Sequence, residues 1–171
     1  NWILKSKKIK IEEISKVICT VPQIIASNLT YNNPRNVKEA QFSMQFAISI
    51  VIKYGSIQLD YLDAEYLFDE SIQKLMKKIV MEVGCLPKSS KQDNQVICPE
   101  WSNVKVLDKY GNSYEKFMGA PIGSSQKPLT QKMLFEKFKS CIEFSKTSYS
   151  SEILYDKLIN IEKIKNCRDL F

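Results

Sequence analysis

The sequence predicts an α+β domain in which a small antiparallel sheet is covered by helices on one face. Three observations predict this class: a β-branched run near the N-terminus, a hairpin signature near residue 110, and several helical segments that begin at capping residues. The length of 171 residues and the 44% hydrophobic content suffice for one sizeable core. They also exclude a disordered chain, because disordered segments lack this much apolar side chain.

The first predicted element is a strand over Ile14–Val21. Its sequence, ISKVICTV, is rich in β-branched residues and stops before Pro22, which has no N–H for a sheet ladder. The basic stretch 5–10 that precedes it is interpreted as a solvated entry to the strand. Residues 26–36 carry the Asn, Pro and Ser residues of a loop.

The second predicted element is one buried helix that begins after Asn36. The Asn36 side chain is a suitable N-cap, and Glu39 occupies the position of a capping-box partner. Residues 40–54 are apolar on nearly every side, and Gly55 follows as a C-terminal stop. Polar side chains in such a helix must face a partner, a cleft or water, and they are Gln41, Ser43 and Gln45.

A third helix is predicted after Asp69, whose carboxylate suits an N-cap. Its apolar stripe has the spacing of one helix face and consists of Ile72, Leu75, Met76, Ile79 and Val80. Residues 87–94 are polar and rich in turn-forming residues, so we expect an exposed loop there.

The C-terminal half predicts a hairpin and then two helices. Residues 104–106 alternate in polarity, residues 108–111 end in a turn glycine, and residues 114–118 return as the second strand. Residues 119–125 form a loop, Thr130 caps a helix, and Ser151 starts the last amphipathic helix. We expect one α+β domain over residues 1–144 and a C-terminal helix over residues 145–171 that packs back on this domain or on a domain outside this sequence.

Composition limits the chemistry that this chain can perform alone. It contains no histidine, and so lacks the commonest general base and metal ligand. The five cysteines are far apart and form no C-x-x-C pair, which argues against a zinc site and favours a reducing compartment, the cytoplasm. The five glycines match no phosphate-binding spacing. We therefore expect no catalytic residue within this chain, no metal and no cofactor.

The charge distribution favours an anionic partner. The formal net charge is +6, from 25 Lys and Arg against 19 Asp and Glu. At the start of the long helix, Arg35 and Lys38 lie beside N–H groups that have no helical partner, an arrangement that suits a carboxylate. An ordinary capped core helix is the alternative interpretation of the same residues.

A resemblance to a known family favours the anion-binding interpretation of this segment over that of an ordinary capped helix. The segment 33–46, N-P-R-N-V-K-E-A-Q-F-S-M-Q-F, is similar to a stretch of the MmgE/PrpD family. That family includes 2-methylcitrate dehydratase, cis-aconitate decarboxylase and iminodisuccinate epimerase. Further similar segments follow in the same order: the helix after Asp69, the hairpin over residues 104–111, and the segment 119–138 with its P-L-T and K-F motifs.

The resemblance implies that the chain is a lid-like domain. In the family, a substrate cleft lies between this lid and an N-terminal helical domain, which carries most of the catalytic histidines. Substrate-holding residues would then be Arg35, Lys38, Gln41, Ser43 and Gln45. The implied activity is proton abstraction beside a carboxylate of a small di- or tricarboxylate, followed by dehydration, decarboxylation or epimerisation, and the isolated chain would be inactive.

Two positions depart from the family pattern. Members often have a basic residue where this chain has Gln41 and a tyrosine where it has Phe46. The resemblance therefore does not decide which substrate is used or which reaction is catalysed. It also does not decide whether the chain forms a homodimer.

A different function remains as an alternative. The chain would then be a non-enzymatic basic module, or a decayed fragment, that binds an anionic partner. Salt-sensitive binding to nucleic acid or to an acidic protein would support this alternative. For the lid-like domain we expect no membrane partner, and no apolar stretch of the sequence reaches the length of a bilayer span. We do not expect nucleic acid as its partner either, because the basic stretch at residues 5–10 alternates with isoleucine and is followed by two glutamates.

Overall fold

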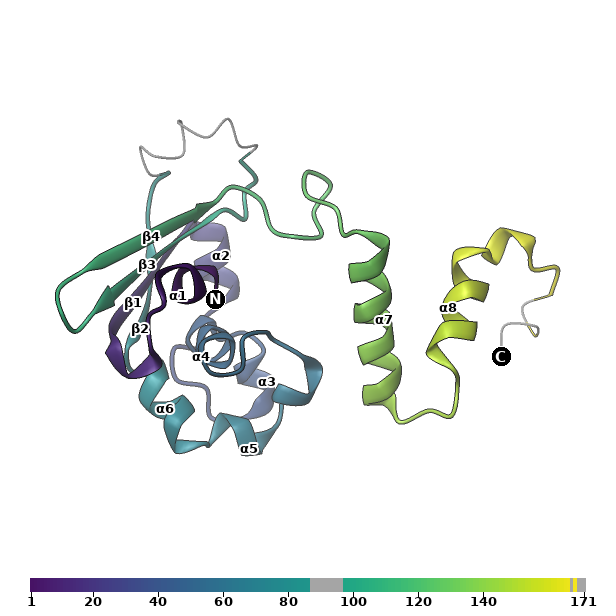
Figure 1. Ribbon diagram of the computed structural model, residues 1–171, viewed down its shortest axis with the longest axis horizontal. Helices are drawn as coiled ribbons and strands as arrows, with labels where there is room; N and C mark the ends of the chain where they lie inside the picture. Colours follow the sequence, from purple (N-terminus) through teal and green to yellow (C-terminus); the bar gives the residue numbers. More distant parts are fainter. Residues whose placement is uncertain (87–96, 167, 169–171) are drawn as a thin grey trace. The chain divides into compact units, whose positions relative to one another are not determined.

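A computed structural model describes residues 1–86, 97–166 and 168 (Figure 1). The chain divides into two compact units, residues 1–127 and 128–171, and each is described by itself. The predicted loop at residues 87–94 lies outside the described residues. The division at residue 144 that the sequence suggested stays a prediction.

The first unit is built on one four-stranded sheet. Its strands are β1 (Ile14–Val21), β2 (Ile79–Val83), β3 (Ser102–Asp108) and β4 (Ser113–Met118), in the order β2-β1-β3-β4. The β3–β4 hairpin and the β1–β3 pair are antiparallel, whereas β1 and β2 are parallel. The predicted α+β class is confirmed, but the sheet is mixed rather than antiparallel, because the chain crosses over through helices between β1 and β2.

Helices fill that crossover and precede the sheet. They are α1 (Trp2–Lys7), α2 (Gln23–Asn28), α3 (Val37–Ala40), α4 (Met44–Tyr54), α5 (Ala64–Leu67) and α6 (Glu70–Met76), with short 3-10 turns η1 (Ile11–Glu13) and η2 (Leu59–Tyr61). Helices α1 and α4 share an apolar cluster with one face of the sheet, in which Ile3, Val17 and Val106 are buried.

Helix α4 lies between two apolar clusters. Its residues Ile48 and Ile52 pack against the sheet cluster. Phe46 and Ile50 are buried in a second cluster with residues of α3, α5 and α6. Residues four apart lie on the same side of a helix, so the two pairs occupy two sides. This explains why the sequence of α4 is apolar nearly all round.

Three sequence predictions in this unit are corrected. The predicted single helix is divided, because Ser43 is extended and its side chain caps a new helix, α4. Ile79 and Val80 belong to β2, since pairing with β1 prevails over their match to the helical stripe. Residues 2–7 and 23–28 form helices α1 and α2, where the sequence suggested a strand entry and part of a loop.

The second unit contains α7 (Gln131–Ser145), α8 (Ser151–Ile159) and the turn η4 (Ile161–Lys163). Thr130 caps α7 as predicted, by accepting the Met133 N–H. The ring of Tyr155 lies 5.0 Å from that of Phe135 and 5.4 Å from that of Phe138, measured between centroids, and joins α8 to α7.

Candidate functional site

The predicted anion-binding segment begins with a short capped helix. The Asn36 side-chain oxygen accepts the Glu39 N–H at 3.0 Å, which confirms the predicted N-cap of α3. The Glu39 carboxylate accepts the Arg35 N–H at 2.7 Å and the Asn36 side-chain amide at 3.0 Å. These three contacts fix the backbone of residues 35–39 without using the Arg35 guanidinium.

Three of the five candidate residues are exposed, namely Arg35, Lys38 and Gln41. In the described part of the chain, neither the Arg35 guanidinium nor the Lys38 ammonium group forms an ion pair. Glu39 is the nearest acid in sequence, and its carboxylate is engaged by backbone and amide donors. Both cations are therefore available to an anion from outside the chain.

The other two candidates, Ser43 and Gln45, are buried, with 1% and 5% of their surface exposed. The Ser43 hydroxyl oxygen accepts the Phe46 N–H at 3.2 Å and so caps α4. Since a hydroxyl has one donor besides its acceptor sites, the Ser43 O–H is still free to donate. The sequence places all five residues in one segment, but the structure separates an exposed group from a buried group.

Gln45 carries an unsatisfied polar atom. Its side-chain nitrogen donates to the Asn32 side-chain oxygen at 3.1 Å, while its own side-chain oxygen is buried without a partner. A buried unpaired carbonyl costs about 1–3 kcal/mol. Reversing both amide groups would keep the Asn32 contact and present the Gln45 NH2 group at the vacant position instead, where it could donate to a carboxylate.

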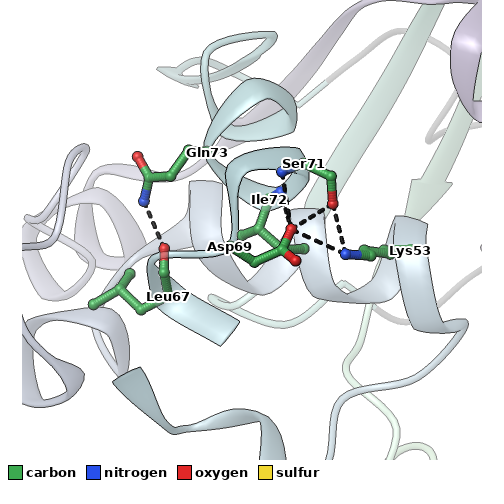
Figure 2. Close-up of polar contacts among 6 residues, drawn as sticks. All are labelled: Lys53, Leu67, Asp69, Ser71, Ile72 and Gln73. Atoms are coloured by element: carbon green, nitrogen blue, oxygen red, sulfur yellow. Dashed lines mark hydrogen bonds and ion pairs between the residues drawn. The ribbon is translucent and has the colours of Figure 1, made fainter. Parts of the chain in front are cut away.

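A second polar cluster joins α4 to α6 and is the cluster in Figure 2. The Lys53 ammonium group donates to Asp69 at 3.0 Å and to the Ser71 hydroxyl at 2.6 Å. Asp69 also accepts the Ser71 and Ile72 N–H groups, which confirms it as the N-cap of α6. The sequence predicted this cap, but nothing in it indicated the contact with Lys53 of α4.

The electrostatics of this cluster argue against a catalytic role. Hydrogen bonds from Ser71 and Lys53 hold the pKa of the Asp69 carboxyl well below its usual range. Burial tends to lower the pKa of Lys53, but hydrogen bonds with Asp69 and Tyr54 outweigh it and raise that pKa. A lysine that stays protonated cannot take a proton from Ser71. The cluster is therefore a structural link between two helices.

No helix among the described residues is both long and apolar enough to cross a bilayer. In residues 1–86, 97–166 and 168, no group of three Cys, Asp or Glu side chains is placed to hold a metal ion.

Comparison with known proteins identifies the family. The family model described as the MmgE/PrpD C-terminal domain matches residues 2–159, which span the sheet, the segment 35–45 and both helices α7 and α8. No curated protein matches the chain. The match covers more than half of the chain and agrees with its α+β fold, so this chain belongs to the MmgE/PrpD family and is its C-terminal domain.

Proposed function

We propose that the chain is the lid-like part of a lyase or isomerase that acts on a small di- or tricarboxylate. Proteins of this family carry a partner domain N-terminal to this one. The reaction would begin with removal of a proton beside a carboxylate and continue by loss of water, loss of carbon dioxide or reprotonation. The chain has no histidine, so acid and base would come from the partner domain.

The observation that carries this proposal is a pair of cations, Arg35 and Lys38, that form no ion pair with any residue of the described ranges. Both are exposed, and Glu39 is occupied by other donors. A guanidinium binds a carboxylate through two parallel N–H groups, and an ammonium group adds a second positive charge. Gln41 is exposed beside them and adds an amide donor.

The two buried candidates have a supporting role in this proposal. Ser43 fixes the start of α4 through its cap on Phe46, and Gln45 ties that start to Asn32. The orphaned side-chain oxygen of Gln45 gives this turn an unmet hydrogen-bonding capacity. Catalytic geometry is sensitive to how such a turn is positioned.

The cytoplasm suits this role. The described cysteines, Cys19, Cys85, Cys98 and Cys141, are all free thiols. Free thiols persist in a reducing compartment, where small polycarboxylates of central metabolism are also found.

Binding and turnover test the proposal separately. Titration of the chain with citrate should show saturable binding that weakens several-fold in Arg35→Gln and in Lys38→Gln, because each variant loses one solvent-exposed charged contact of up to about 1 kcal/mol. Lys77→Gln is the matched control: Lys77 is also an exposed lysine without an ion pair among the described residues, but it follows α6. Equal weakening in all three variants would indicate only a general attraction to positive charge.

The isolated chain should not turn over cis-aconitate or 2-methylcitrate. Saturable catalysis by these 171 residues alone would contradict the assignment of acid and base to a partner domain. The alternative of a basic interaction module predicts binding to nucleic acid or an acidic protein that falls steeply with salt.

A further inference from the structure

A cavity of about 750 Å³ opens between α1, β3, β4 and the loop after β4. Most of its lining is apolar, and its polar lining residues are Asn1, Lys116, Gln126 and Lys127. The volume falls within the range of small-molecule sites, which combine an apolar wall with a few polar groups. Arg35, Lys38, Gln41, Ser43 and Gln45 are absent from its lining, so it is separate from the site of the proposed function.

The two lysines of this lining, Lys116 and Lys127, have no acidic partner among the residues that the structure describes. The ion pairs within the described residues involve Lys53, Lys74 and Lys139, and neither Lys116 nor Lys127 takes part in one. Lys116 is half-buried, and its ammonium nitrogen lies 4.7 Å from the centroid of the Trp2 ring. An ammonium group held against an aromatic ring on an apolar wall loses part of its hydration. An anion bound beside the Lys116 ammonium group would replace the interactions with water that this group has lost.

An apolar slot adjoins this cavity. A second cavity of about 260 Å³ shares Asn1, Ile3 and Val104 with the first and lies between α1, α4 and the sheet. Except for Asn1, its lining is wholly apolar: Ile3, Leu4, Val17, Ala47, Ile48, Val51, Ile52, Ile57, Val104 and Val106. The Asn1 side-chain nitrogen is itself used by the Gly55 carbonyl. The α-ammonium group of Asn1 also lies at this entrance, and burial lowers its pKa. Beyond Asn1, the residues that line the slot offer a ligand no charged side chain.

We propose that the two cavities together bind an organic anion with a linear apolar chain, of the fatty-acid type. The carboxylate lies against Lys116 and Lys127, and the alkyl chain passes Ile3 and Val104 into the slot beside α4. The cations select against a neutral head group, and the apolar slot selects against a second charge on the ligand. Citrate has no alkyl chain to fill the slot, so we do not expect it to compete with decanoate at this site.

Calorimetric titration with hexanoate, octanoate and decanoate, each below its micellar concentration, tests the proposal. The chain, and any longer form in which it is made, should bind one decanoate per protein. The dissociation constant should fall about fourfold for each added methylene, which corresponds to about 0.8 kcal/mol per buried CH2. Decanol, with the same alkyl chain and no charge, should bind at least tenfold more weakly than decanoate.

Variants separate the head-group contact from the slot. Lys116→Met keeps the apolar stem and should weaken decanoate about tenfold while leaving decanol unchanged. Lys109→Met is the matched control, because Lys109 lies 5.1 Å from the Tyr110 ring in a similar cation–π contact but lines neither cavity. Ala47→Leu narrows the slot and should weaken the dependence of the dissociation constant on the length of the alkyl chain. Circular dichroism verifies that each variant is folded.

Several results would overturn this proposal. One is the absence of saturable decanoate binding up to 1 mM. Another is an affinity that stays the same from hexanoate to decanoate. A third is a decanol affinity equal to the decanoate affinity. Competition between citrate and decanoate would also overturn it. The proposed function is tested independently, since Arg35→Gln should weaken citrate alone and Lys116→Met should weaken decanoate alone.

Discussion

Replacing Ser43 by alanine tests the division between α3 and α4. Ser43 is 1% exposed, and its hydroxyl oxygen is the acceptor for the Phe46 N–H at 3.2 Å. Loss of an N-cap costs about 0.5–2 kcal/mol, and the N–H left behind belongs to Phe46, which is also buried. We therefore expect Ser43→Ala to lower the free energy of unfolding by about 1–2 kcal/mol, in the upper part of that range.

Ser49 provides a control within the same helix. It is 0% exposed, and its hydroxyl donates to the Gln45 carbonyl at 2.8 Å. That carbonyl already lies in the helical ladder, and such back-bonding from serine does not stabilise a helix. Ser49→Ala should therefore change stability by less than about 0.5 kcal/mol.

Urea unfolding measures both variants, with tryptophan fluorescence as the signal. The two tryptophans, Trp2 and Trp101, both lie in the first unit, so the signal reports the unit that contains α4. For a chain of this size, each kcal/mol also corresponds to roughly 2–4 °C in Tm. A Ser43→Ala protein as stable as Ser49→Ala would refute the capping argument and restore the continuous helix that the sequence suggested.

Three further predictions follow from described contacts. Ile50→Ala should lower the free energy of unfolding by about 2–5 kcal/mol, because Ile50 is 0% exposed. Ile24 of α2 is 54% exposed, so Ile24→Ala should change the free energy of unfolding by less than about 0.5 kcal/mol in the same urea assay. Asp69→Asn should lower stability at pH 7, and the difference from the wild type should narrow progressively as the pH falls below about 3.9. The reason is that a carboxyl whose pKa is depressed by folding stabilises the fold fully above its unfolded pKa and less and less as the pH falls toward its folded pKa. A constant difference over pH 2–7 would contradict this. Burial raises the pKa of the Cys19 thiol to about 11. Iodoacetamide at pH 8 should therefore modify the exposed Cys141 and leave Cys19 unmodified until urea unfolds the chain. Equal labelling rates of the two thiols in the native protein would show that Cys19 is accessible.

Local chemistry was sufficient to predict many of the elements. The strand Ile14–Val21, the N-caps Asn36, Asp69 and Thr130, and the helix stop at Gly55 could all be inferred from the sequence. Each depends on a side chain and a few neighbouring backbone groups. Gly55 has a φ of 86°, a left-handed conformation that favours glycine.

Elements that depend on distant partners could not be predicted in this way. Ile79 and Val80 fit a helical stripe as well as a strand, and only their pairing with Val17 and Ile18 of β1 decides between them. The direction of β2 likewise follows from the crossover and not from its own residues. Helix α1 is short and basic, and Ile3 is its only buried residue.

The candidate site was predictable in its composition but not in its exposure. The sequence placed Arg35 and Lys38 beside a helix start, and both are exposed there. The burial of Ser43 and Gln45 depends on α4 lying between two apolar clusters, which requires the tertiary fold. The cluster of Lys53, Asp69 and Ser71 joins residues 16 and 18 positions apart, beyond the range of helix-capping patterns.

The position of β1 in the sheet has a consequence for biosynthesis. This strand is made before the other three, yet both of its edges pair with strands that the ribosome completes later, β2 on one side and β3 on the other. An apolar strand with two bare edges is a template for unwanted association until its neighbours emerge. Nascent chains halted before residue 79 should therefore bind chaperones that recognise exposed hydrophobic segments, and chains released after residue 118 should not.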